Sequence, residues 1–202
     1  MSRSLTKKLP VKPPRDLAAL LDDLPLIGEE KAEDYNNLLT AVVLGAKPAD
    51  AIDWLYVKDI VDLTWDIRRE RVIKIAIIKE AHREVVLELL KATREEPDSL
   101  KAHVYRIFEA EIDAERWSTN TESKKHVNAI LTERGYPPSA VLAKAYEKAA
   151  AQVDVVERRI ASYEMRKMVI LREVERRNDR LSRQLQNASA EVIDAEFSEA
   201  AE

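Results

Sequence analysis

Three aspartates lie close together on one predicted helix, and carboxylates are suited to acid–base or metal chemistry. Asp59, Asp62 and Asp66 are spaced by three and four residues, so they form a row on one helical face. Carboxylates on facing bundle helices bind metals, usually beside a Glu-x-x-His motif, which this sequence lacks. We therefore expect no metal site, and we interpret the row as a polar seam beside a buried helix face.

The remaining residue types offer little for catalysis. The chain has no cysteine, which excludes thiolate chemistry and cysteine-based zinc sites, and its three glycines form no phosphate-binding loop. His82, His103 and His126 belong to no close histidine pair and to no zinc-binding helix motif. We expect a protein that is not an enzyme, with no catalytic residues, no cofactor and no small-molecule substrate.

Two groups of basic residues are candidate phosphate contacts. One lies in the N-terminal segment (Lys7, Lys8, Lys12 and Arg15), and the other, here called the arginine row, contains Arg172, Arg176, Arg180 and Arg183. Phosphate contacts need only cations at suitable spacing, so nucleic-acid binding is the alternative function. The net charge of −4 and the acidic C-terminal end argue against a general affinity for nucleic acid.

The arginine row also offers a complement to the aspartate row, since it spans roughly 16 Å of helix, as does the acidic stretch from Asp59 to Glu70. Lys58 can form an ion pair with Asp62 within one helix, and Arg69 can form one with Asp66. Asp59 has no cation three or four residues away. We predict that the two long helices lie side by side and that some of these charges pair. The predicted seam contains Asp59, Asp62, Asp66, Arg69, Arg166, Arg172 and Arg176. The alternative is that both rows are solvated helix faces.

The helix that carries the aspartates is predicted to be central. On a helical wheel its apolar residues cover about 220°, much more than the ~100° stripe of a surface helix. The predicted core anchors are Trp54, Leu63, Trp65, Ile67, Ile160 and Tyr163. Trp54 and Trp65 fit the buried arc better than Trp117, which leaves Trp117 as a candidate anchor for a partner.

Five helices are expected, and two of them are long. They span residues 29–44, 48–94, 99–117, 122–134 and 138–187. Gly45 is the expected stop of the first helix, and Thr119 with Glu122 matches a capping box. Apolar residues of the last helix recur at steps of four and three, and this heptad seam includes Leu181 and Leu185. The sequence predicts an all-α, elongated helical bundle with coiled-coil-like packing.

The two ends of the chain differ from the predicted bundle over 29–187. Residues 1–28 form a basic, proline-containing segment that we expect to be a flexible arm. Residues 188–202 contain five acids and no base, so we expect a disordered acidic tail. No apolar run approaches the roughly 18 residues of a membrane span, and we expect a cytoplasmic protein that does not contact a membrane.

Three segments resemble a family of uncharacterised bacterial all-helical proteins. They are "LIGEEKAEDYNNLL", "VKDIVDLTWDIRRERVIK" and "RRIASYEMRKMVILREVERR". The resemblance implies that the Asp/Trp/Arg helix and the arginine-rich last helix are recurring partners, and it implies no activity. The predicted helical bundle, which lacks catalytic and metal-binding motifs, favours a scaffold or protein-interaction role, with self-association through the last helix. Nucleic-acid binding through the arm and the arginine row remains the alternative.

Overall fold

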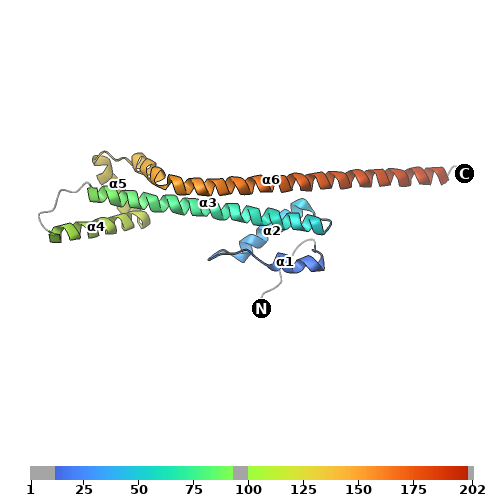
Figure 1. Ribbon diagram of the computed structural model, residues 1–202, viewed down its shortest axis with the longest axis horizontal. Coiled ribbons are helices and arrows are strands. Elements are labelled where there is room, and N and C mark those ends of the chain that lie inside the picture. Colours follow the sequence, from blue (N-terminus) through green and yellow to red (C-terminus); the bar gives the residue numbers. More distant parts are fainter. Residues whose placement is uncertain (1–11, 93–99, 200–202) are drawn as a thin grey trace. The chain divides into compact units, whose positions relative to one another are not determined.

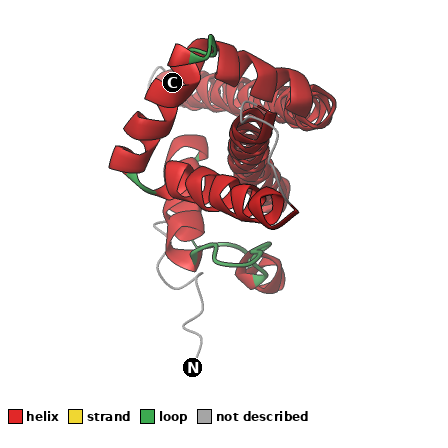
Figure 2. Cartoon of the chain, turned by 90° about the vertical axis from the view of Figure 1, so that its left-hand side faces the viewer, coloured by secondary structure: helices red, strands yellow, loops and turns green. Residues whose placement is uncertain are grey.

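Helices make up the described chain apart from short connections. The computed structural model describes residues 12–92 and 100–199, with the side chains of all but 100–103, 181 and 184–199. The elements are a 3-10 turn (Arg15–Leu17), α1 (Ala18–Asp22), α2 (Ala32–Ala46), α3 (Ala51–Ala92), α4 (Leu100–Thr119), α5 (Thr121–Glu133) and α6 (Pro138–Glu199). These residues contain no strand, and Figure 2 shows helices joined by loops. The predicted all-α bundle with two long helices, α3 and α6, is confirmed.

The chain divides into two compact units. The first unit consists of Met1–Arg68 and Ala161–Glu202, and the second unit consists of Arg69–Ile160. The long helices α3 and α6 each contribute to both units, whereas α1 and α2 belong to the first and α4 and α5 to the second (Figure 1). Each unit has its own hydrophobic core.

The core of the first unit joins α1 and α2 to the first part of α3. Its buried residues are Leu21, Tyr35, Leu39, Val43, Trp54, Val57, Val61 and Trp65. On each helix these residues recur every three or four positions, which brings them onto one face. The aromatic rings of this unit therefore lie on the α3 face that is covered by α2.

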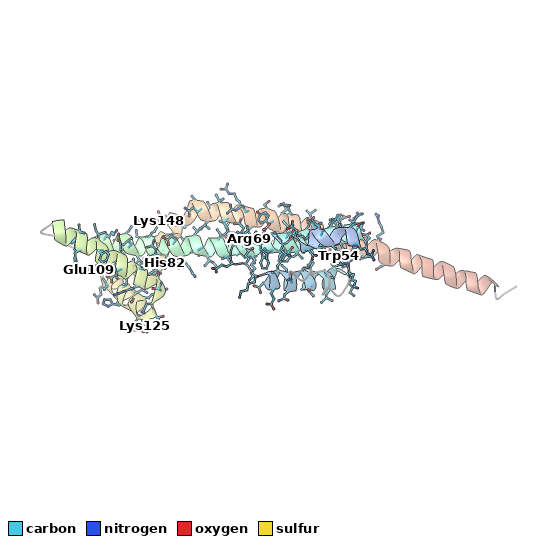
Figure 3. The ribbon with its side chains drawn as sticks, turned by 90° about the horizontal axis from the view of Figure 1, so that it is seen from below. Trp54, Arg69, His82, Glu109, Lys125 and Lys148 are labelled. Atoms are coloured by element: carbon cyan, nitrogen blue, oxygen red, sulfur yellow. The ribbon has the colours of Figure 1, made fainter. Side chains whose placement is uncertain are left out.

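The core of the second unit combines the rest of α3 with α4, α5 and the first part of α6. Its buried residues include Val86, Leu90, Trp117 and Leu131, and several alanines, such as Ala114 and Ala145, allow helices to approach closely. Lys148 on α6, labelled in Figure 3, adds a surface ion pair with Glu84 at 3.1 Å. Apolar packing is therefore the main stabilising interaction of this unit.

Near both chain ends the structure shows helix outside the predicted bundle over 29–187. The sequence predicts a flexible arm over residues 1–28, but residues 15–22 form the 3-10 turn and α1, because Leu21 is buried in the first core. It also predicts disorder over 188–202, but α6 continues to Glu199. Alanine and glutamate are frequent in this end and favour helix, and neither proline nor glycine follows Pro138. Residues 1–11 and 200–202 lie outside the described part.

Two local sequence signals, the predicted stop of α2 and the predicted cap of α5, were assigned to the wrong residues. Gly45 lies inside α2, and the helix ends at Ala46. Its C-cap, Lys47, adopts a left-handed conformation with φ of 49° and donates its N–H to the Val43 carbonyl. The cap of α5 is Asn120 rather than the predicted Thr119, and its side chain accepts hydrogen bonds from the amides of Glu122 and Ser123. Asparagine is among the residues preferred at the N-cap position, and here its side chain satisfies two amides of the first turn.

Candidate functional site

Asp62 lies at the centre of a polar network between α2 and α3. Its Oδ1 accepts a hydrogen bond from the Tyr35 hydroxyl at 2.5 Å, and its Oδ2 accepts one from Lys58 Nζ at 2.5 Å. Lys58 is buried, and its ammonium also lies 5.8 Å from the centre of the Tyr35 ring. We call Tyr35, Lys58 and Asp62 the Asp62 network. One oxygen of the carboxylate therefore accepts a hydrogen bond from α2, and the other accepts one from α3 itself.

Trp65 extends this polar contact toward the start of α2. Its indole N–H donates to Glu30 Oε2 at 2.9 Å, and its ring meets the Tyr35 ring edge-to-face with centroids 5.4 Å apart. The Arg68 guanidinium lies 4.8 Å from the Trp65 ring centre and pairs with Asp34 at 3.2 Å. Trp65 thus packs with its apolar surface while its single polar group is satisfied.

The surroundings of Tyr35 keep its hydroxyl protonated. Burial is the main cause of the raised pKa, and the hydrogen bond to Asp62 and the charges of Asp62 and Asp66 raise it further. A catalytic tyrosine would need a pKa moved toward neutral pH, which is the opposite direction. We therefore interpret the Asp62 network as a structural contact that holds α2 on α3.

The described contact between the first part of α3 and α6 is made by Arg177. Its guanidinium donates to Asp53 Oδ1 at 2.8 Å and to Asp50 Oδ2 at 2.5 Å. Burial acts to raise the pKa of Asp53, but the Ala49 amide and Arg177 outweigh it and hold the pKa below its ordinary value. In the sequence, Arg177 looks like an interruption of the apolar seam, yet it is the residue that joins α6 to the beginning of α3.

Replacing Arg177 by glutamine is expected to lower the urea midpoint of unfolding at neutral pH. The lowered pKa of Asp53 contributes stability above its ordinary value of 3.8, and that contribution disappears as the pH falls through the lowered pKa. The difference between the wild type and Arg177→Gln should therefore shrink toward about pH 3. Urea titrations followed by circular dichroism at both pH values check this, and an equal difference at both would contradict the Asp53 pairing.

The predicted seam between the two long helices is wrong for two of its members. Asp62 pairs with Tyr35 and Lys58, and Arg176 makes a two-point contact with Glu173 on its own helix. The reason is that α2, rather than α6, covers the α3 face on which Asp62 lies. Of the other members, Asp59, Arg166 and Arg172 are exposed, and Asp66 and Arg69 are half-buried.

The acidic face of α3 continues beyond the aspartate row to Glu70, which has a partner on α6. Glu70, one turn after Asp66, is buried in the second unit and lies 3.0 Å from Arg159 of α6, an ion pair without hydrogen-bond alignment. An acid on α3 thus does pair with an arginine on α6 in this unit, but the arginine precedes the arginine row.

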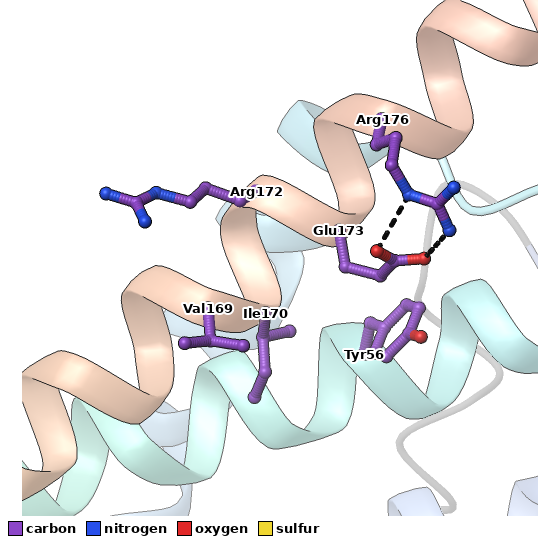
Figure 4. A pocket seen from close by; sticks show the side chains of 6 residues that line it. All are labelled: Tyr56, Val169, Ile170, Arg172, Glu173 and Arg176. Atoms are coloured by element: carbon purple, nitrogen blue, oxygen red, sulfur yellow. Dashed lines mark hydrogen bonds and ion pairs between the residues drawn. The ribbon is translucent and has the colours of Figure 1, made fainter.

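A surface pocket of about 390 Å³ lies beside the arginine row in the first unit. It is lined by Tyr56, Val169, Ile170, Arg172, Glu173 and Arg176. In Figure 4 the Arg176 guanidinium bonds to Glu173 above the Tyr56 ring, whereas Arg172 extends away from both. Tyr56 and Glu173 are members that the charge pattern did not single out, because neither belongs to a row of like residues.

The other candidate phosphate contacts are dispersed. Arg180, Arg183, Lys12 and Arg15 are exposed, and Lys7 and Lys8 lie outside the described residues. Of the candidate phosphate contacts that the structure describes, the members of the arginine row lie together on one helix, α6.

The predicted core anchors are nearly all buried. Trp54, Leu63, Trp65, Ile67 and Ile160 are buried, and Tyr163 is half-buried. The hypothesis that Trp117 anchors a partner is wrong, since it is 5% exposed, donates to Asn128 at 2.9 Å and packs against His82. Burial, together with the charge of Lys124, lowers the pKa of His82.

No grouping of three or more potential metal ligands occurs in the part of the chain that the structure describes. Within the same residues, no helix has the length and apolar character required to cross a membrane. A scan against protein-family models, a search of curated proteins and a search of solved structures each found no match for this chain.

Proposed function

We propose that this is a non-enzymatic helical interaction protein that self-associates through the C-terminal end of α6. The observation that carries the proposal is that α6 continues beyond its partner helix. Arg177 contacts Asp50 and Asp53 at the beginning of α3, yet α6 runs on to Glu199 (Figure 1). The side chains described beyond this contact, those of residues 178–180, 182 and 183, are all exposed.

A helix that projects in this way gains stability from a partner. Helical stability in proteins comes mainly from packing an apolar face, and the side chains described beyond Arg177 pack against no other helix of the chain. The heptad seam read from the sequence continues past Arg177 through Leu181 and Leu185. A second copy supplies a matching seam, and symmetric pairs of identical chains are the commonest oligomers.

Exposed apolar side chains on the described part of α6 also support an interaction role. Met165 is 72% exposed, Val169 is 61% exposed and Met168 is 49% exposed. Their spacing places them on one helix face, so they form a group rather than scattered single residues. Methionine adapts readily to different surfaces, which suits a contact between proteins.

Charge placed on the heptad seam is expected to abolish self-association. The variant Leu181→Glu with Leu185→Glu should weaken the assembly more than about tenfold, because each copy would lose two apolar contacts. The control Ser182→Glu with Gln186→Glu adds the same charge one position away and should leave the assembly intact. Light scattering on the full-length chain over a range of concentrations measures both. A wild-type chain that stays monomeric throughout, or equal effects of both variants, would refute the proposal.

Nucleic-acid binding is the second candidate, and the exposed arginine row favours it. Arg172 and Tyr56 line the same pocket, which thus offers a cation for a phosphate and an aromatic ring for a base. The link from Arg176 to Glu173 and the acids that follow the row weaken this reading. A salt titration with a labelled single-stranded oligonucleotide separates the two functions. Affinity that falls steeply with salt supports phosphate contacts, and no binding at low salt excludes them.

A further inference from the structure

The last part of α6 carries its charges in two blocks of opposite sign. Residues 165–183 contain the bases Arg166, Lys167, Arg172, Arg176, Arg177, Arg180 and Arg183 and the acids Glu173, Glu175 and Asp179. Residues 184–202 contain no base and the acids Glu191, Asp194, Glu196, Glu199 and Glu202. Since α6 continues as one helix to Glu199, the two blocks follow each other along a single helix.

Some arginines of the basic block form ion pairs within the chain, and others are exposed to solvent. Arg177 is bound by Asp50 and Asp53, and Arg176 by Glu173. Arg172, Arg180 and Arg183 are exposed and make no ion pair with the residues whose side chains are described. The available cations thus include two, Arg180 and Arg183, that lie beyond the beginning of α3, where a second helix can reach them.

We infer that the end of α6 pairs in antiparallel orientation with the same helix of a second copy. The two helices would cross between Arg183 and Glu191, so that the arginines of each copy lie along the acidic block of the other. A parallel pair in register would instead set base against base and acid against acid, which is destabilising. An antiparallel pair of identical helices has the two-fold symmetry in which every contact occurs twice. The inference rests on the proposed self-association and specifies its geometry.

Single cysteines report the orientation directly, because the natural chain contains none. Donor and acceptor groups with a short Förster distance of about 20 Å are placed on two pools of Ser198→Cys and, separately, on Asn178→Cys mixed with Ser198→Cys, because a rise of 1.5 Å per residue puts the two Ser198 positions of the antiparallel pair roughly 33 Å apart. In the antiparallel pair, the two Ser198 positions lie on opposite sides of the crossing, whereas position 178 of one copy approaches position 198 of the other. Efficient energy transfer only in the mixed sample is the expected result. Efficient transfer between two Ser198→Cys chains would overturn the orientation and leave self-association standing, whereas a monomer by light scattering would overturn both.

Charge reversal provides an independent test of the same geometry. The variant Arg180→Glu with Arg183→Glu should weaken self-association about tenfold, since each reversed charge acts twice in a symmetric pair. Adding Glu191→Lys and Glu196→Lys to the same chain should restore it, because the blocks become complementary again. The control Lys12→Glu with Arg15→Glu makes the same change in net charge away from α6 and should have little effect.

Two results would contradict the antiparallel pairing in this second test. If the control weakens self-association as strongly as the α6 variant, the basic N-terminal segment rather than the arginine row is the partner of the acidic block. If the four-residue swap fails to restore assembly while the protein keeps its helical circular dichroism, the two blocks do not face each other.

Discussion

Replacing Trp65 by alanine is expected to lower the free energy of unfolding of the first unit by about 3–5 kcal/mol. The side chain is 3% exposed and belongs to the core formed by α1, α2 and α3. Removing it leaves a cavity beside Tyr35 and withdraws a neighbour from the Arg68 guanidinium. It also leaves Glu30 without the indole donor. Urea unfolding followed by circular dichroism measures the change.

Two further substitutions show which property of Trp65 is responsible. Trp65→Phe keeps most of the ring packing and loses the hydrogen bond to Glu30, so a loss of about 1 kcal/mol is expected. Met165→Ala removes a large side chain of the same unit that is 72% exposed, and it should change stability by less than about 0.5 kcal/mol. A Trp65→Ala protein as stable as the Met165→Ala control would show that this ring is not a core residue.

Helical periodicity was sufficient to identify the elements and the buried face of α3. The wide apolar arc predicted that Trp54 and Trp65 would be buried, and both are. Most of the predicted helix ends agree with those of the structure to within a few residues. The ends of the chain were the exception, because charge pattern was given more weight there than helix propensity. Alanine and glutamate extend α6 to Glu199 despite the concentration of negative charge.

The partner of the aspartate row could not be predicted from spacing. Spacing fixes the direction of Asp62 around α3 but does not say which helix lies in that direction. The local contact from Lys58 was predictable because it lies one turn away on the same helix. The contact from Tyr35 depends on how α2 docks, and a buried tyrosine gives no sign in the sequence that it needs an acceptor. Likewise, an arginine within an apolar seam does not reveal that Asp50 and Asp53 face it.

A comparison of Asp62 with Asp59 separates a buried polar contact from a solvated charge of the same row. Asp62→Ala is expected to reduce stability by about 2 kcal/mol, because buried Lys58 and the Tyr35 hydroxyl each lose their acceptor. Asp59→Ala removes a carboxylate from the same helix, but Asp59 is exposed, so a change below about 0.5 kcal/mol is expected. Urea unfolding of the two variants in the same buffer gives the comparison.

The Tyr35→Phe background tests whether the cost of losing Asp62 arises from the network itself. With the hydroxyl already absent, Asp62→Ala leaves one fewer buried group unpaired, so its cost should fall by roughly 1 kcal/mol. Asp59→Ala should cost the same in either background, because Asp59 shares no contact with Tyr35 within the described residues. Strictly additive effects of Tyr35→Phe and Asp62→Ala would mean that the two side chains are not energetically coupled. Asp62 would then be coupled to Lys58 alone, within α3, and its hydrogen bond from Tyr35 would not help to hold α2 on α3.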